Sequence, residues 1–179
     1  GGSERALYLR RAINILVDYQ EFLDIFSNGR GRIQEGPVPE TVARISNVDL
    51  PHNDFIFEET DQGRQKKSLD EARHWLAQAG YPGGIDPETG RPLRLTLTTS
   101  KTADPSVQNQ LVWWTEQFQS VGINLVIETV YPQQVFEVFS TGQTQLFQMG
   151  WITDYPSSEN FLFLFYGPNA VIHSEGVNY

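Results

Sequence analysis

The spacing of apolar residues predicts two consecutive helices at the start of the chain. The first covers residues 4–17, where apolar positions repeat every three or four residues. Asp18 opens an Asp-x-x-Glu capping box, which predicts a second helix over 19–27. Asn28 and Gly29 tolerate positive φ, so we expect them to end that helix.

Residues 30–67 show no clear periodicity. The sequence Gly-Pro-Val-Pro over 36–39 is incompatible with a continuous helix, although a short helical turn over 40–45 is allowed. A loop of this length is unusual inside a compact domain. We interpret it as an extended surface segment, with a functional loop as the alternative.

Two further helices have clear apolar faces. One begins at the capping box opened by Ser68 and ends at Gly80. The other covers 105–121, begins at Asp104 with a first-turn proline, and ends at Gly122. Its apolar stripe at 4-3-4-3 spacing consists of Val107, Leu111, Trp114, Phe118 and Val121.

The second half of the chain alternates strands and helices. The predicted strands are 93–97, 123–130 and 145–152, and the helices between them are 105–121 and 132–141. Such alternation with short connections implies parallel strands joined by right-handed crossovers. The expected fold class is therefore α/β, a parallel βαβαβ core with flanking helices, and we interpret 1–179 as a single domain.

Composition narrows the class of protein. The 179 residues are 39% hydrophobic and 12% aromatic, as in a globular domain. The net charge is −9 and the basic residues are scattered, which argues against nucleic acid or an anionic membrane surface as a partner. With no cysteine, disulfides and Cys-based zinc sites are excluded. No signal-peptide pattern occurs, and residues 1–3 resemble a cloning remnant.

The sequence contains no template for catalysis. It has no Gly-x-Ser-x-Gly, no Gly-rich phosphate loop and no His-Glu-x-x-His. His52, His74 and His173 lie far apart in the sequence, and no pair of carboxylates stands out as an acid/base couple. We expect no enzyme, no catalytic residue, no metal and no cofactor. The alternative is an α/β enzyme whose catalytic residues are dispersed over several loops.

The carboxyl ends of the predicted strands are where open parallel sheets bind ligands. Two such ends are residues 98–101 and 150–155. The second contains Trp151, Asp154 and Tyr155, an indole, a carboxylate and a phenol. The carboxylate suits a ligand ammonium, and the rings suit its apolar parts. On spacing alone the alternative is a structural role, with Trp151 and Tyr155 in the core and Asp154 capping the next helix.

Several segments carry motifs that occur together in one protein family. Residues 9–29 contain the pattern Arg-x-Ala…Asp…Gly, and residues 150–160 read Gly-Trp-x-x-Asp-Tyr-x-x-x-x-Asn. Residues 68–84, SLDEARHWLAQAGYPGG, resemble the pattern Asp-x-x-x-Ala-x-x-Leu-Leu-x-x-Ala-Gly-Tyr, and residues 117–126, QFQSVGINLV, resemble Leu-x-x-x-Gly-Ile-x-Val. In this order they resemble the bacterial extracellular solute-binding proteins of family 5 (cluster C), which include oligopeptide- and dipeptide-binding proteins.

The resemblance implies a periplasmic-binding-protein-like lobe, most of the one called domain III. Such a lobe is one half of the substrate-binding component of a peptide-type ABC importer. A small peptide or similar solute would lie between it and an N-terminal lobe outside this chain, and ABC permease subunits would be further partners. The end of the chain, 173–179, resembles the point before a further helix, so we also expect this lobe to be incomplete.

The expected location is periplasmic or extracytoplasmic, with a lipid-anchored form as a variant. Members for nickel, sugars or other solutes share the scaffold, so the ligand class stays open. A related alternative is the cytoplasmic ligand-sensing domain of a regulator with the same fold.

The resemblance also bears on single residues. In peptide-binding members the carboxylate matching Asp154 receives the α-ammonium of the peptide, and the residue matching Trp151 borders the pocket. This favours a ligand-binding role for Asp154. The run 161–166 resembles the helix after the motif, and its unbroken apolarity predicts burial on two sides, in part by neighbours missing from this chain. Apolar surface left by missing neighbours is expected to favour self-association.

Overall fold

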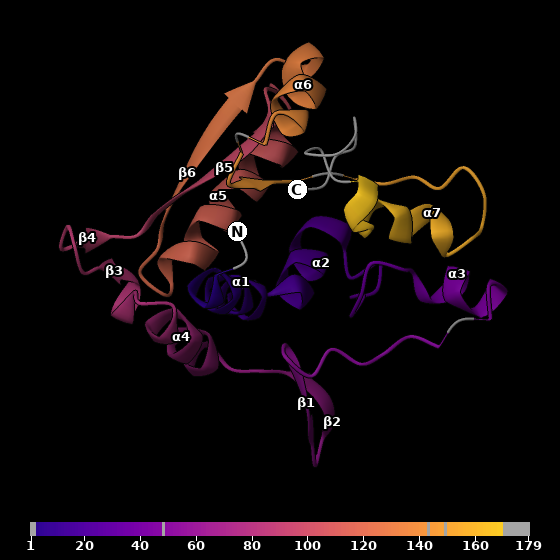
Figure 1. Cartoon of the computed structure of the whole chain (residues 1–179), viewed down its shortest axis with the longest axis horizontal. Helices are drawn as coiled ribbons and strands as arrows, with labels where there is room; N and C mark the ends of the chain where they lie inside the picture. Colours follow the sequence, from indigo (N-terminus) through magenta and orange to yellow (C-terminus); the bar gives the residue numbers. More distant parts are fainter. Residues whose placement is uncertain (1–2, 48, 143, 149, 170–179) are drawn as a thin grey trace. The chain divides into compact units, whose positions relative to one another are not determined.

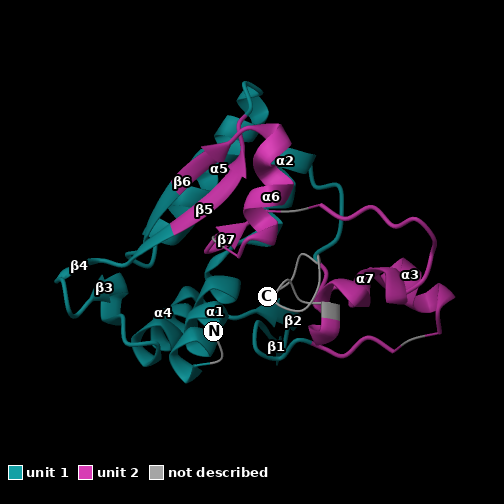
Figure 2. Ribbon diagram, turned by 45° about the horizontal axis from the view of Figure 1, so that its top comes forward, with its two compact units in different colours: residues 1–33, 53–95, 102–126 teal, residues 34–52, 96–101, 127–179 magenta. Residues whose placement is uncertain are grey.

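The structure, a computed structural model, describes residues 3–47, 49–142, 144–148 and 150–169. The chain divides into two compact units (Figure 2). Unit 1 comprises Gly1–Ile33, Asn53–Leu95 and Thr102–Val126; unit 2 comprises Gln34–His52, Thr96–Lys101 and Ile127–Tyr179. Each unit is described by itself below.

The predicted helix pair at the start of the chain is confirmed. Helix α1 spans Glu4–Leu16 and α2 spans Tyr19–Ser27. The Asp18 carboxylate accepts hydrogen bonds from the first backbone N–H groups of α2, as its capping position requires. Asn28 ends α2 in the left-handed region, at φ 50°.

Helix α4 (Leu69–Gln78) packs against α1, and the two lie side by side in Figure 1. Ser68 caps α4 as predicted. Beyond its last turn the Arg5 guanidinium donates to the Ala79 carbonyl, at 3.1 Å. Gly80 follows at φ 90°, where a side chain would be strained and would also meet Arg5. The apolar residues buried between the helices are Ala12, Ile15, Leu16, Ala72 and Leu76.

The region 30–67 contains more regular structure than the sequence indicated. The short turn over 40–45 is a helix, α3 (Glu40–Ile45). Strands β1 (Phe57–Thr60) and β2 (Gly63–Lys66) form an antiparallel hairpin that was not predicted. Its residues are mostly exposed, so no alternating apolar pattern marked it.

The predicted α/β class is confirmed by a three-stranded sheet in the order β6-β5-β7. The strands are β5 (Arg94–Ser100), β6 (Asn124–Val130) and β7 (Leu146–Phe147). Strand β7 is parallel to β5, with Leu97 opposite Leu146. Strand β6 also runs parallel to β5, because hydrogen bonds join residue 93 to 124 and residue 101 to 130. A second two-stranded hairpin, β3 (Ile85–Asp86) with β4 (Arg91–Pro92), precedes β5 after a 3₁₀ turn, η1 (Pro82–Gly84).

The third strand is much shorter than predicted. The expected range was 145–152, but β7 ends at Phe147. At its start the Gln145 side chain, not its backbone, accepts from the Thr96 N–H at 2.8 Å. Beyond it Gly150 and the almost fully exposed Ile152 do not continue a buried face. The apolar residues in the range 145–152 therefore do not all belong to one strand.

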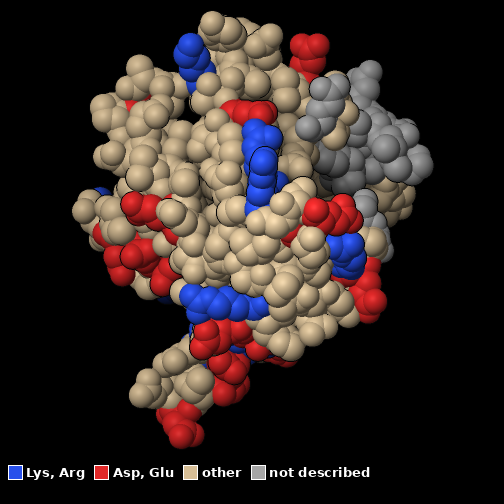
Figure 3. All heavy atoms as spheres, turned by 90° about the vertical axis from the view of Figure 1, so that its left-hand side faces the viewer, with Lys and Arg blue, Asp and Glu red and all other residues tan. Residues whose placement is uncertain are grey.

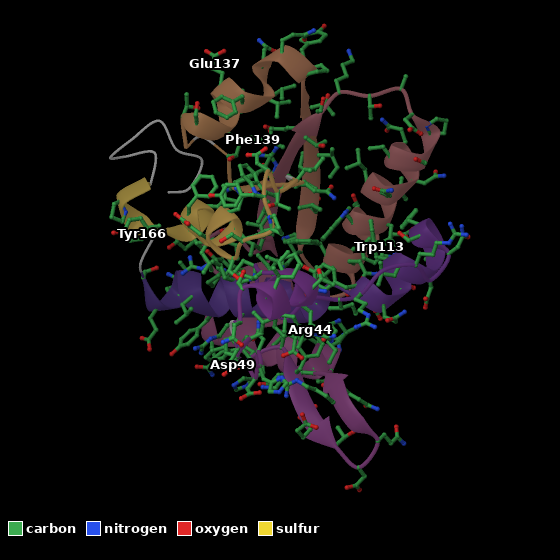
Figure 4. All side chains as sticks on the ribbon, turned by 90° about the vertical axis from the view of Figure 1, so that its right-hand side faces the viewer. Arg44, Asp49, Trp113, Glu137, Phe139 and Tyr166 are labelled. Atoms are coloured by element: carbon green, nitrogen blue, oxygen red, sulfur yellow. The ribbon has the colours of Figure 1, made fainter. Side chains whose placement is uncertain are left out.

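Helix α5 (Pro105–Gln119) is capped by Asp104 as predicted, but its buried face is wider than the stripe. Trp113 lies off the stripe and is only 5% exposed, whereas Trp114 is half-buried. The reason is α2, whose Glu21 carboxylate accepts from the Trp113 indole N–H at 2.8 Å. The Phe22 ring meets Trp113 edge-on at 5.3 Å. Figure 4 shows Trp113 between α5 and α2.

Glu21 is a shared acceptor between α2 and α5. The same carboxylate oxygen also accepts from the Gln117 amide at 2.9 Å, and the Gln117 oxygen accepts from the Asp18 N–H at 3.0 Å. Burial lowers the pKa of nearby Lys66, and the carboxylates of Asp18 and Glu21 oppose that shift. These contacts tie α2 to α5 through polar groups.

In unit 2 the chain after β6 forms a 3₁₀ turn, η2 (Pro132–Gln134), and then α6 (Val135–Ser140). Phe139 of α6, labelled in Figure 4, packs its ring 4.5 Å from that of Phe147 in β7. The last described elements are α7 (Glu159–Leu162) and the 3₁₀ turns η3 (Phe163–Phe165) and η4 (Gly167–Asn169).

The described chain does not bury residues 161–166 on two sides, and burial by neighbours outside this chain stays a prediction. Phe161 is buried, but Leu162 and Phe163 are exposed, and Phe165 is 66% exposed. Of the apolar residues of the short helix α7, Phe161 is the buried one, in a cluster with Val38, Val42 and Ala43. Sequence apolarity alone did not indicate this.

Backbone segments of unit 1 approach very closely at Gly84 and Gly122. A Cβ on Gly84 would lie 2.5 Å from the Gly122 carbonyl carbon, and one on Gly122 would lie 2.2 Å from the Gly83 oxygen. Both glycines also have positive φ. Only glycine fits this contact, which joins the start of β3 to the turn before β6.

We expect G84A to destabilise the protein far more than its neighbour G83A. Gly83 has a similar φ of 62° but open space around its Cβ position, so G83A should cost about 1–2 kcal/mol for the left-handed backbone alone. G84A adds overlap with backbone atoms that cannot move aside, and should cost at least about 3 kcal/mol. Urea unfolding of both variants checks this. Equal losses would show that the close approach is not rigid.

We expect E21A to destabilise the protein by about 1–3 kcal/mol, because it leaves the buried Trp113 indole N–H without an acceptor. E21Q is the matched control, since its amide oxygen can still accept, and it should lose less than half as much. Both are measured by urea unfolding followed by tryptophan fluorescence. A larger loss in E21Q than in E21A would contradict the shared-acceptor role.

Candidate ligand-binding site

The predicted site residues lie together on one irregular segment of unit 2, between β7 and α7. Trp151, Asp154 and Tyr155 are all exposed, Trp151 by 37% and Tyr155 by 49%. The residue before α7 is Ser158, not Asp154, and its side chain makes no capping hydrogen bond. The three side chains are thus accessible to a ligand, and their binding role stays a prediction.

Two side chains near α7 contact Trp151. Its indole N–H donates to the Asn160 side-chain oxygen at 2.9 Å. The Phe163 ring meets the indole in a T-shaped contact, with ring centroids 5.4 Å apart. Such aromatic contacts fix orientation as well as burying area. The exposed part of the indole is left to face solvent or a ligand.

The turn that carries Asp154 is closed by local hydrogen bonds. The Thr153 hydroxyl and the Ser157 N–H both donate to the Tyr155 carbonyl. At the end of the turn the Ser158 N–H donates to the Ser46 hydroxyl at 3.1 Å. Asp154 therefore lies on a short loop whose flanks are fixed.

Helix α3 supports this loop from a distant part of the sequence. Val42 and Ala43 of α3 share a buried cluster with Phe161 of α7, and Ser46 follows directly after α3. Sequence reasoning missed this role and read the segment as a surface connection. The available signal was the apolar pair Val42-Ala43 between charged residues, as in a short amphipathic turn.

A cation lies at the carboxyl end of the neighbouring strand. Lys101 follows β5, and its ammonium is 5.2 Å from the centroid of the Tyr131 ring, which follows β6. The Lys101 N–H donates to the Val130 carbonyl at 2.7 Å, so the two strand ends are joined. The sequence indicated the end at 98–101 but not Tyr131, whose signal is its position directly after the predicted second strand of the sheet.

Metal-binding side chains are not clustered in the described part of the chain. Within it, no three His, Asp or Glu residues lie close enough to hold a metal ion. His52 faces Glu35 at 3.6 Å and His74 packs against Trp75, while His173 lies outside the described residues. On the face drawn in Figure 3, basic side chains are interspersed with acidic ones. None of the described helices has the length and apolarity to cross a membrane.

Comparison with known proteins identifies the family. The family model described as bacterial extracellular solute-binding proteins, family 5 Middle, matches residues 7–172. The chain belongs to this family. The predicted resemblance is confirmed, and so is the expectation of a binding protein, because family 5 proteins are solute-binding proteins and not enzymes. They are extracellular or periplasmic. No curated protein sequence matches the chain.

Solved structures of low identity share the fold of this family 5 chain. The murein tripeptide binding protein MppA of Escherichia coli has a TM-score of 0.71 at 17% identity, over 99% of this chain and 32% of its own. NikA from Brucella suis, in complex with Fe(III)-EDTA, has a TM-score of 0.68 at 18% identity, over 97% of this chain and 32% of its own. DppA from Helicobacter pylori, in complex with the peptide STSA, has a TM-score of 0.64 at 22% identity, over 89% of this chain and 27% of its own.

These matches establish a partial periplasmic-binding-protein-like fold. The chain spans about a third or less of the length of each of these structures. Their bound molecules differ, a peptide in one and a metal chelate in another, so the likeness shows the fold and leaves the solute open.

Proposed function

We propose that this chain forms one wall of the solute site in the substrate-binding component of a peptide-type ABC importer. The observation that carries the proposal is the exposed Asp154 carboxylate, set between two exposed aromatic residues on a loop with fixed flanks. Family 5 membership and the peptide or tripeptide named for the DppA and MppA structures support a short peptide as the solute.

The chemistry of the wall suits a free peptide. Asp154 offers an anionic acceptor for an α-ammonium, and the faces of Trp151 and Tyr155 suit apolar side chains. Lys101, at the carboxyl end of the strand paired with β7, offers a cation for a carboxylate. The carboxyl ends of parallel strands meet at one edge of the sheet, so Asp154 and Lys101 both belong to that edge. Their opposite charges suit the ammonium and the carboxylate at the two ends of a peptide.

A single exposed wall binds weakly. Charge pairs open to water contribute about 0–1 kcal/mol, and they strengthen when water is excluded. We therefore infer that a second lobe closes over the ligand, in polypeptide beyond this segment, and that the closed form docks on permease subunits. The site of action is extracytoplasmic, with either a free or a lipid-anchored protein.

We expect D154N, in the full-length protein containing this segment, to weaken binding of Ala-Phe-Ala about tenfold to a hundredfold, because it removes the negative charge that would pair with the peptide ammonium. N-acetyl-Ala-Phe-Ala, which lacks the ammonium, should bind the native protein more weakly than the free peptide by a similar factor. D154N should weaken binding of this acetylated peptide little further. D61N, at an exposed turn of the β1–β2 hairpin, is the control for the charge change. Titration calorimetry measures all of these. Equal affinity for free and acetylated peptide would contradict the ammonium site.

We expect residues 1–179 alone to bind the same peptides only at millimolar concentration or more weakly. If the whole protein binds at micromolar affinity, about −8 kcal/mol, then loss of half the contacts leaves about −4 kcal/mol. Calorimetry on the isolated segment, with unfolding curves to show that it is folded, tests this. Micromolar affinity in the isolated segment would contradict a site shared between two lobes.

A further inference from the structure

We propose that Asn160 is a positioning residue that fixes the indole plane of Trp151 at the rim of the solute site. The inference rests on the proposed function, since it gives Trp151 a ligand to face. Asn160 does not itself line the exposed surface, because it is only 4% exposed. Its effect on binding would pass through the indole.

The geometry around Trp151 leaves one orientation favoured. The indole has a single hydrogen-bond donor, and Asn160 accepts from it at 2.9 Å. The edge contact with Phe163 restrains the ring from a second direction. A buried acceptor paired with a donor on an otherwise exposed ring is a costly contact to break, because Asn160 would then be left unsatisfied.

Asn160 is itself held by its neighbours in α7. Its backbone N–H donates to the Ser157 carbonyl at 3.1 Å. The adjacent Phe161 packs in the buried cluster with α3, and Ser158 is bound to the Ser46 hydroxyl. The orientation of the indole is therefore set by a chain of contacts from α3 through α7. A turn held only by contacts between sequence neighbours would not restrain the indole in this way.

The position of the loop follows from the same contacts. Trp151 is tied to α7 at one side of the turn, and Ser158 is tied to Ser46 at the other. Asp154 lies between these two anchors. Loss of the Asn160 contact would free the indole first and would loosen the Asp154 side of the turn second.

The first test needs no ligand and uses the indole N–H resonances of protein labelled with ¹⁵N-tryptophan, with W151F to assign the Trp151 signal. In N160L we expect this signal to shift and its exchange with water to rise about fivefold to tenfold, as for one lost hydrogen bond. The signals of Trp75, Trp113 and Trp114 should stay unchanged. An unaltered Trp151 signal would overturn the positioning role.

N160D is the conservative variant, because its carboxylate retains the acceptor. Slow exchange of the Trp151 indole N–H should be restored in it. During a pH titration the Trp151 signal should follow the titration of the new carboxylate, and the signals of Trp75 and Trp114 should not. Trp113 is not a control in this experiment, because its indole N–H donates to the Glu21 carboxylate. This measurement also decides the question if N160L fails to fold. A Trp151 signal that ignores this titration would overturn the proposal.

The second test measures binding of Ala-Phe-Ala to the full-length protein. N160L should weaken it about threefold to tenfold while N160D binds close to native affinity, because one contact with an aromatic face is partly lost. Altered indole exchange with unchanged peptide affinity would overturn the link between Asn160 and the ligand. If the native protein binds no peptide, the proposed function fails, while the indole measurements still decide whether Asn160 positions Trp151.

Discussion

The parallel pairing of β5 with β7 is the constraint on which the arrangement of the candidate site depends. It joins residues about 50 positions apart, Leu97 with Leu146 and Thr98 with Phe147. Only through this register does the segment after β7 begin at the same sheet edge where Lys101 follows β5. The pairing is short, and side chains reinforce it: Gln145 extends the ladder toward Thr96, and Phe139 packs on Phe147.

A second layer of contacts is needed because the site loop has no ladder of its own. Backbone groups outside regular structure need other partners, and here the Thr153 and Ser46 side chains provide two of them, while the Asn160 side chain accepts from the Trp151 indole. Helix α3 and α7 are each too short to be stable alone, and they stabilise each other through the cluster around Phe161. A segment that reads as a surface connection is thus structural support for the loop.

The sequence predicted what depends on near neighbours and missed what depends on distant ones. The caps at Asp18, Ser68 and Asp104 were predictable because each bonds an N–H two or three residues away. The burial of Trp113 was not, because its partner Glu21 is 92 residues distant. The early end of β7 and the exposure of Phe165 have the same cause, since they depend on which neighbours the chain provides. The three candidate site residues were predicted from their position after a strand together with the family motifs. Neither signal alone distinguishes a residue that contacts ligand from a residue of the core.

The exposure of Asp154 has a physical consequence for the solute-site wall that we propose. A carboxylate buried in the empty site would pay a desolvation penalty whether or not solute is present. An exposed one stays hydrated until a second surface arrives, and its attraction for an ammonium then grows as the local dielectric falls. The gain is thus coupled to closure, and closure in turn requires the solute to bridge both surfaces. If the proposed site is correct, a loop with fixed flanks, its charge in water and its indole already oriented would reduce the ordering cost of closure, so that a weak half-site could contribute to a tight whole one.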